Sequence, residues 1–466
     1  MLIRPIACVV DYVNALNQSL KQLSAESTLT GSQRNWFVTV LLGLLVAGSF
    51  NFACFSRRSL GEYKEEGLRW IFHRAIIAWS MILQASISLV LSHYSIKQGV
   101  LALDDSDKVR SRNTTKISGV HKVKDKKTGG WFKGQEFVFL ILVANNVTLP
   151  VGFRFYTPDP AIKEWKEKIK AQKKAGVLPK DRAKRPEPNP AYPSKQTLGL
   201  ELLATFKTHH PEVSIQSVLA DALYGNAHFM DEASKVTACT QVISQLRSNQ
   251  LIRSYAKNRS LTHYFNRTAG VISKLIIRGG EEKKVTMLCA RLIVKSHGKK
   301  RFVVALKYEN ETDYRFIVGT DLTWRAQDIA RAYTLRWLVE VFIQDWKRHG
   351  GWNTLSKQQG ADSAMRGVIL SLLCDHLLLL HPFQSARLKN KQPGLSVGCL
   401  REHINAEALL ESVRHIVEAS EPKKALEKFK TALEEALPER QSTKHLAGRD
   451  LGRLEPTPSL KYQKAA

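Results

Sequence analysis

Acidic residues are scarce in this sequence. Its 466 residues hold 42 Asp and Glu against 70 Lys and Arg, a formal net charge of +28. An imbalance of this size argues against a general enzyme of small molecules and favours a polyanionic partner. Because every neutralised phosphate releases counterions, nucleic acid is the first candidate and an anionic membrane surface the second. The positive charge is spread along the whole chain, which favours nucleic acid.

Cysteine is also rare, and no two cysteines form a C-x-x-C pair, so a structural zinc site is not expected. Free thiols in a reducing cytosol are the default expectation. The start of the sequence is not followed by a short apolar core with a small-residue cleavage site, so no signal peptide is expected. The six cysteines are Cys8, Cys54, Cys239, Cys289, Cys374 and Cys399.

Uninterrupted apolar runs are few. An uncharged stretch of twenty residues occupies 36–55, and shorter apolar runs occupy 75–90 and 368–380. Polar residues interrupt all three, including Gln84 in the second and Asp375 in the third. We predict three buried helices, with a membrane span as the alternative for the first run.

The hydrophobic content of 44% and the length predict a folded protein of two or three domains. Residues 1–95 are predicted to be an N-terminal helical, DNA-binding domain. Segments 96–249 and 321–385 would form an α/β catalytic core, and 250–320 would be a β-rich insertion between them. A basic segment and linker at 160–195 lies within the first core segment. Residues 386–466 would be a helical region with a disordered polar tail.

The stretch from Tyr333 to Lys347 has apolar residues at helical spacing and no Gly or Pro, which predicts one continuous helix. At about 100° per residue, Tyr333, Arg336, Glu340 and Lys347 fall within a wedge of about 60°. A carboxylate flanked by two cations and a phenol suits an acidic metal ligand beside groups that hold phosphates. An ordinary ion pair between Arg336 and Glu340 is the simpler alternative.

Two aspartates further up the chain follow apolar strands. Asp105 is predicted to end the strand that begins at 100–103, and Asp221 to end the strand at 218–220. Carboxylates at strand ends gather at one edge of a sheet, where ligands bind. With Glu340 they would supply the oxygen ligands that phosphodiester chemistry with two divalent ions requires. Asp104 remains an alternative to Asp105, and each aspartate alone could be a turn or capping residue.

These motifs resemble a known family. The pattern Tyr333-x2-Arg336-x3-Glu340-x6-Lys347 matches the signature of bacterial insertion-sequence transposases with a DDE active site. The segment 103–106, Leu-Asp-Asp-Ser, is similar to the first-aspartate motif of that family, although the family often has Thr where this chain has Ser106. The segment 219–225 is similar to its second motif, Asp-x-x-Tyr-Gly, and the block 128–134 also resembles the family.

The resemblance implies a fold and a reaction. The fold would be an RNase H-like mixed sheet flanked by helices, with a mostly β insertion between the second Asp and the Glu. The reaction would be cut-and-paste transposition: cleavage at transposon ends and transfer of the 3′-hydroxyls into target DNA. Asp105, Asp221 and Glu340 would bind Mg²⁺, for which Mn²⁺ could substitute.

The same resemblance implies partners and a location. Arg336 and Lys347 would hold DNA phosphates, and Tyr333 would contact the backbone or a distorted nucleotide. The partner would be double-stranded DNA with inverted repeats, bound by a homodimer in the bacterial cytoplasm, at the nucleoid, with no membrane involved. Two alternatives remain: an RNase H-like nuclease that takes no part in transposition, and a DNA-binding remnant without catalysis.

Overall fold

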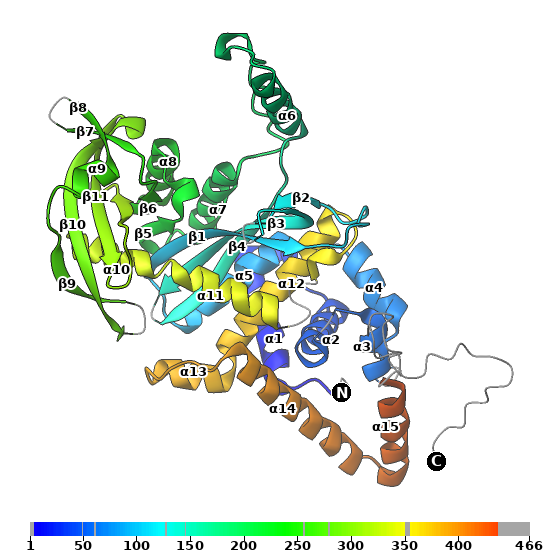
Figure 1. Ribbon diagram of the computed structural model, residues 1–466. Helices are drawn as coiled ribbons and strands as arrows, with labels where there is room; N and C mark the ends of the chain where they lie inside the picture. The colour runs from blue at the N-terminus through cyan, green and yellow to red at the C-terminus, as the bar shows by residue number, and fades with distance from the viewer. Residues whose placement is uncertain are drawn as a thin grey trace, which may run out of the picture.

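A computed structural model describes residues 4–436 except for short gaps. The gaps are residues 49, 60–61, 126–127, 145, 255–256, 278–279 and 350–354. The described part is a mixed α/β fold in which helices flank a twelve-stranded mixed sheet (Figure 1). The tail for which the sequence predicts disorder lies outside the described residues.

Helices form the first part of the chain, as predicted. Thr30 and Gln33 cap α2 reciprocally, and Gly48 ends that helix in the left-handed conformation (φ 64°), which suits glycine. Trp36 packs edge-on against Phe37 and Trp79 in the core between these helices. The helices are α1 (Ala7–Leu23), α2 (Gly31–Ala47), α3 (Phe52–Arg58), α4 (Glu65–Arg74) and α5 (Trp79–His93).

Five strands form the central part of the sheet in the order β4-β3-β1-β5-β6. The pairs β4–β3 and β3–β1 are antiparallel, whereas β1–β5 and β5–β6 are parallel. A short strand, β2, pairs with the start of β3. The strands are β1 (Gln98–Val109), β2 (His121–Lys124), β3 (Trp131–Ala144), β4 (Val147–Tyr156), β5 (Ser214–Ala220) and β6 (Val242–Leu246).

Strands β3 and β4 form a hairpin, and the prediction for the first strand is wrong in one respect. Strand β1 continues through Asp104 and Asp105 to Val109, so Asp105 lies inside the strand and does not end it. The reason is the long partner β3, which pairs with β1 from Val100 to Val109 and keeps the polar half extended.

The region 250–320 consists mostly of strands, which continue the same sheet. Strand β12 pairs antiparallel with β6, and the order runs on through β11, β10, β7 and β8, while β9 pairs with β10. Figure 1 shows this region as a green and lime lobe beside the central strands. The strands are β7 (Leu251–Ser254), β8 (Lys257–Ser260), β9 (Val271–Ile276), β10 (Glu282–Val294), β11 (Lys299–Tyr308) and β12 (Arg315–Gly319), and the helix α9 spans Leu261–Phe265.

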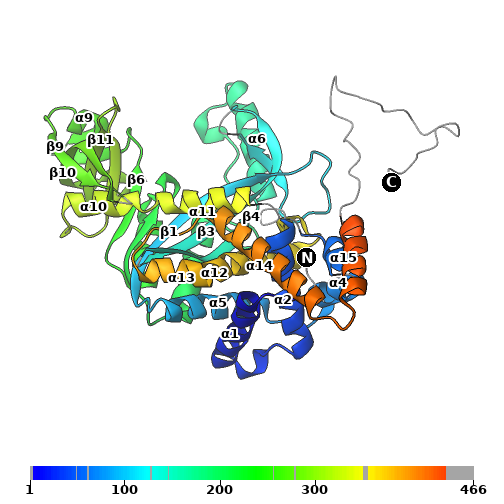
Figure 2. The same ribbon diagram turned by 90° about the horizontal axis from the view of Figure 1, so that it is seen from below.

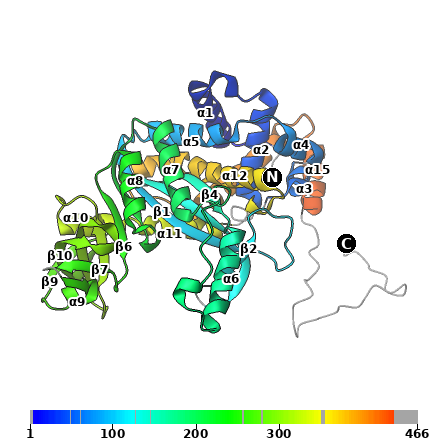
Figure 3. The same ribbon diagram turned by 90° about the horizontal axis from the view of Figure 1, so that it is seen from above.

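Helices α7 (Lys195–His209) and α8 (Ala227–Thr237) connect the central strands, and α6 (Pro160–Lys174) projects away from them (Figures 1 and 3). The later helices lie in different places: α10 packs against the β-rich lobe, α11 packs against β1 and β3, and α12 to α14 lie near α2 and α5 (Figure 2). They are α10 (Ala326–Thr334), α11 (Trp337–Arg348), α12 (Ala361–Leu380), α13 (Pro382–Lys389), α14 (Val397–Val417) and α15 (Pro422–Ala436).

The three apolar runs are helical. Among the described residues, α12 alone is long and apolar enough to span a membrane by itself, and two sharply bent pairs, α2 with α3 and α4 with α5, would qualify as broken spans. Of the residues in the apolar stretch of α12, 72% are buried within the fold. This burial agrees with the predicted packing of α12 inside the protein.

Candidate active site

Strands β1 and β5 bring three aspartates together. Leu103 pairs with Ala220 in the parallel register, so the next residues, Asp104 and Asp221, come to the same level of the sheet. One carboxylate oxygen from each of Asp104, Asp105 and Asp221 lies within 4.8 Å of the other two. Residues more than a hundred positions apart in the sequence thus form one acidic group.

Arg336 connects Glu340 to this acidic group. Its guanidinium donates from Nη1 to Asp104 Oδ2 at 2.6 Å and from Nη2 to Glu340 Oε1 at 2.8 Å. The prediction of one continuous helix is wrong at this point: α10 ends at Thr334 and α11 begins at Trp337. A tight turn, in which the Arg336 N–H bonds to the Tyr333 carbonyl at 3.2 Å, joins the two helices.

Asp104 and Asp105, as successive residues of a strand, leave the backbone on opposite faces of the sheet, although their carboxylate oxygens come within 4.8 Å of each other. Asp104 pairs with Phe139 and Ser106 with Phe137, and both rings pack against Trp346 of α11. Cross-strand partners share a face, so Asp104 lies on the side of α11 and Glu340. Asp105 instead accepts a 2.6 Å ion pair from Lys195, at the start of α7.

Burial and charge act together on these carboxylates. Burial raises the pKa of Asp104 to about 6; Arg336 opposes the rise, and Asp221 and Asp105 add to it. Burial also works against the charge of Lys195, but its ion pairs with Asp105 and Glu136 outweigh that effect and raise its pKa. Crowded carboxylates need nearby cations to remain charged, and two side chains of the protein supply them.

Lys195 belongs to a chain of contacts that the sequence did not reveal. Its Nζ lies 2.6 Å from both Asp105 and Glu136, and Glu136 also lies 2.7 Å from His121 Nε2. The contacts with His121 and Lys195 lower the pKa of Glu136 although its burial would raise it. No local motif marks these residues, because only the pairing of β1, β2 and β3 brings them together.

Two hydrogen bonds and one close backbone contact fix the turn that carries Asp221. Asp221 Oδ1 accepts the Leu223 N–H at 2.9 Å, and its backbone carbonyl accepts the Ser244 hydroxyl at 2.7 Å. The next residue of the motif, Gly225, has no room for a side chain, since a Cβ there would lie 2.5 Å from the Gln245 carbonyl oxygen. This explains the glycine of the Asp-x-x-Tyr-Gly pattern.

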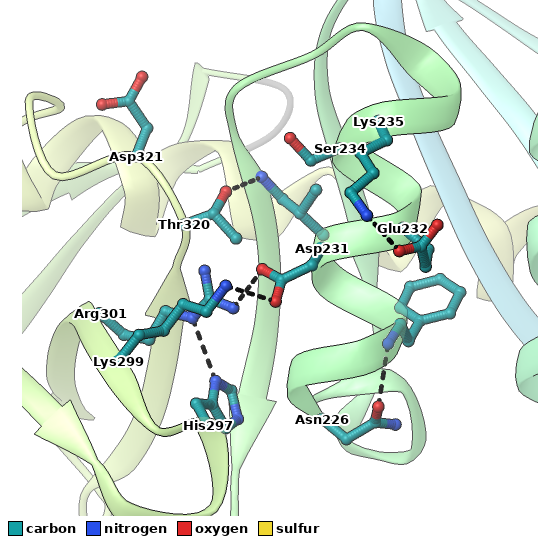
Figure 4. Close-up of polar contacts among 12 residues, drawn as sticks. Asn226, Asp231, Glu232, Ser234, Lys235, His297, Lys299, Arg301, Thr320 and Asp321 are labelled. Carbon is teal, nitrogen blue, oxygen red and sulfur yellow. Dashed lines mark hydrogen bonds and ion pairs between the residues drawn. The ribbon is translucent and has the colours of Figure 1, made fainter.

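Residues of the β-rich region also contact this turn and the helix α8 that follows it (Figure 4). His297, between β10 and β11, contacts the Gly225 carbonyl at 3.1 Å through Nε2. Arg301 donates to His297 Nδ1 at 3.1 Å and to Asp231 of α8 at 2.6 Å, and Lys299 joins the same carboxylate at 2.7 Å. These contacts lock the β10–β11 hairpin to the helix that follows Asp221.

Cations gather at the other end of β1 and α11. Burial lowers the pKa of Lys108, and the positive charges of Arg110, Lys347 and Lys357 lower it further. Lys347 follows Glu340 by seven residues, or about 10 Å along a helix. The predicted phosphate-binding lysine therefore lies in a cationic group beside the acidic one.

Tyr333 lies at the junction of α10 and the central sheet. Its hydroxyl donates to Gln245 Oε1 at 3.3 Å, and the Arg336 guanidinium sits 5.7 Å from the centre of its ring. Burial raises the pKa of the phenol to about 12. Tyr333 thus supports Arg336 in this structure, and its contact with DNA stays a prediction.

The acidic group fits a divalent cation. All of its donors are carboxylate oxygens from well-ordered elements, the ligands that Mg²⁺ and Mn²⁺ prefer. Asp104, Asp105 and Asp221 could hold an ion directly, and Glu340 stands next to them across Arg336.

A second group of possible ligands, Cys8, His381 and Glu407, is accounted for by its own contacts. The Cys8 thiol donates to Glu407 at 3.9 Å, and His381 Nδ1 accepts the Phe383 N–H at 3.4 Å. That acceptor role places the ring proton on Nε2, which faces Glu407 at 3.5 Å. We assign no ion to this group.

Comparison with known proteins agrees with this site. The family described as DDE superfamily endonuclease matches residues 26–270, and the family described as Transposase DDE domain matches residues 187–374. No curated protein matches the sequence. Among solved structures, the piggyBac transposase in a synaptic complex with hairpin DNA is similar at 10% identity and a TM-score of 0.40, over 95% of this chain and 85% of that chain. That structural similarity is too low to support an argument.

The first family match covers more than half of the chain and includes both aspartate motifs, and the second covers the residues from the start of α7 to within α12. The chain therefore belongs to the DDE superfamily of endonucleases, as a DDE transposase.

Proposed function

We propose that this protein is a cut-and-paste DNA transposase that cleaves insertion-sequence ends and joins the 3′-hydroxyls to target DNA by two-metal phosphoryl transfer. One observation carries the proposal. Carboxylates from β1 and from the end of β5 meet in one place, and Arg336 connects Glu340 of α11 to them by contacting Asp104 at 2.6 Å and Glu340 at 2.8 Å. Three separate elements supplying acidic oxygens is the arrangement that metal-dependent phosphodiester chemistry needs.

The sheet topology supports an RNase H-like core. The order β4-β3-β1-β5-β6, with three antiparallel strands followed by two parallel ones, is the order expected of that fold. Asp104 and Asp105 lie on its central strand and Asp221 at the end of the adjacent one. The strands of 251–319 would then be the insertion between the second aspartate and Glu340.

The side chains of this site have distinct roles in the proposal. Divalent ions, when bound, would activate the attacking oxygen and stabilise the leaving oxygen. Asp221, Glu340 and one of the two β1 aspartates would hold them. The shared face with α11 favours Asp104 as that residue, and Asp105 would be held by Lys195 beside it.

Arg336 has two uses in this account. Its planar guanidinium balances Asp104 and Glu340 while no DNA is bound, and the same group suits bidentate contact with a phosphate. Lys347 would hold a second phosphate further along the backbone, and Tyr333 would keep Arg336 in position. We further propose that a homodimer acts on paired DNA ends in the bacterial cytoplasm.

Glu340→Gln tests the proposal directly. The amide keeps the size of the side chain but is a poor ligand for Mg²⁺, so we expect duplex binding to persist while Mg²⁺-dependent cleavage falls by about 10³-fold or more. Asp345→Asn on the same helix is the matched control and should cleave normally. Cleavage by Glu340→Gln at the normal rate would overturn the assignment.

A nuclease with no part in transposition is the alternative. The two are separated by incubating the protein with Mg²⁺, DNA that carries the inverted repeats flanking the gene, and a target plasmid. A transposase joins the cut ends to the plasmid, whereas a nuclease leaves free ends.

A further inference from the structure

The segment between β4 and α7 folds on itself as a projecting arm, residues 157–194. Helix α6 turns back at Gly176, which has a positive φ of 74°, and the returning chain is fixed to it by side chains. Trp165 Nε1 donates to the Ala183 carbonyl at 2.8 Å, and Gln172 Oε1 accepts the Ala183 N–H at 3.0 Å. Figure 1 shows the arm standing clear of the other elements.

One side of α6 packs against the rest of the arm. Ile162, Trp165, Ile169 and Gln172 are partly buried at helical spacing, while the remaining residues of the helix are exposed. No residue of α6 is fully buried. The arm therefore has a small core of its own and contributes little to the main core.

The neighbouring side of α6 carries a lysine stripe. At about 100° per residue, its five lysines lie within about 100° of one another and cover about 16 Å of the helix axis. All five are exposed, and in the arm, which the structure describes completely, none of their ammonium groups has a hydrogen bond or ion pair. The lysines of the stripe are Lys163, Lys166, Lys170, Lys173 and Lys174.

The base of the arm lies at the acidic site. The arm leaves β4 after Tyr156 and enters α7 at Lys195, whose ammonium group is 5.1 Å from the centre of the Tyr156 ring and 2.6 Å from Asp105. Prolines at 186, 188, 190 and 193 stiffen the segment that returns from the tip of the arm to α7. The stripe is thus carried on a semi-rigid support that starts at the candidate catalytic carboxylates.

We propose that this arm is a DNA clamp whose lysine stripe binds the phosphates of duplex DNA beside the site of cleavage. Duplex DNA carries one negative charge per about 1.7 Å of its axis, so a stripe of about 16 Å matches roughly half a helical turn. The inference deepens the proposed function and rests on it, because DNA at the acidic site is what brings a duplex to the arm.

The test replaces all five stripe lysines by glutamine in the full chain, since glutamine keeps helix propensity and removes charge. Binding to a fluorescent duplex of mixed sequence is followed by anisotropy over a series of salt concentrations. Each lost phosphate contact lowers the slope of log K against log salt by about 0.9. We expect the slope to fall by about 2 to 4 and the affinity at moderate salt to fall at least tenfold.

The matched control replaces the same five lysines by arginine, which keeps the charge and should keep the slope. Cleavage by chymotrypsin at Trp165, which should be slow while the arm is folded, reports whether the arm stays folded in both variants. A glutamine variant that is folded and binds with the original slope would overturn the inference. A preference of the stripe for single-stranded DNA or RNA over the duplex would also overturn it.

The two proposals can fail separately. If the unaltered protein cleaves DNA and the glutamine variant binds as it does, the clamp is wrong and the proposed function stands. If the unaltered protein binds duplex DNA but never cleaves it with Mg²⁺, the proposed function is wrong whatever the arm does.

Discussion

Single charged side chains control the acidic site. Arg336 holds Asp104 and Glu340, and Lys195 holds Asp105, so each β1 aspartate has its own cation on its own face of the sheet. The sequence predicted the acidic residues and Arg336 but not Lys195 or Glu136. From the family pattern it favoured Asp105, which precedes Ser106, over Asp104. The face of the sheet that α11 covers favours Asp104 instead.

Asp104→Asn and Asp105→Asn separate the two candidates. We expect the Asp104 change to abolish Mg²⁺-dependent cleavage, since Asp104 shares a face with Glu340. The Asp105 change should lower the rate by a smaller factor through loss of the Lys195 contact. Cleavage rates over a Mn²⁺ series measure both effects, and the opposite order would assign the ligand to Asp105.

A partly buried carboxyl outside the site should make stability depend on pH. Burial in α12 raises the pKa of Asp375 to about 7, with Asp345 adding to the rise. A raised carboxyl pKa favours the folded state at low pH, and this contribution is lost as pH rises through about 7. Asp375→Asn should therefore stabilise the protein more at pH 8 than at pH 5.

We expect that difference in unfolding free energy to be about 1–2 kcal/mol, below the full linkage value because the side chain is only partly buried. Urea unfolding at both pH values measures it. Asp362→Asn, at the exposed start of the same helix, is the control and should show no such difference. An equal effect of Asp375→Asn at the two pH values would contradict the explanation.

At the scale of elements, the sequence predicted helices and strands well where apolar periodicity was strong. It missed the break between α10 and α11 because no Gly or Pro marks the turn at Leu335 and Arg336. It also ended β1 too early, since the charged half of that strand is held extended by its partner β3. Both errors come from tertiary contacts that override local preference.

Close packing of one helix provides a test at this scale. A Cβ on Gly367 of α12 would lie 2.3 Å from the Leu355 carbonyl oxygen, and backbone cannot move aside cheaply. Gly367→Ala should lower the unfolding free energy by about 1–3 kcal/mol. Gly67→Ala, in α4 with nothing within 4 Å, should instead be neutral or raise it by up to about 1 kcal/mol. Thermal unfolding of the two variants compares them, and similar shifts would contradict this packing.

For the whole molecule, the net charge of +28 pointed to nucleic acid before any motif was considered. The structure places some of that charge where it can act: a cationic group around Lys347 beside the carboxylates, and the exposed stripe of α6. Motif order predicted the family and the acidic residues. How the β10–β11 hairpin locks onto the Asp221 turn could not be predicted, since that contact joins segments seventy residues apart.

The central claim is that the carboxylates of β1, β5 and α11 form a divalent-metal site. A crystal structure of the full chain grown with Mn²⁺ tests it most directly, because an anomalous-difference map locates the manganese ions. We predict a manganese peak bound by Asp221 and Asp104, with Glu340 turned from Arg336 toward the ion. Manganese peaks elsewhere and none at these carboxylates would contradict the claim.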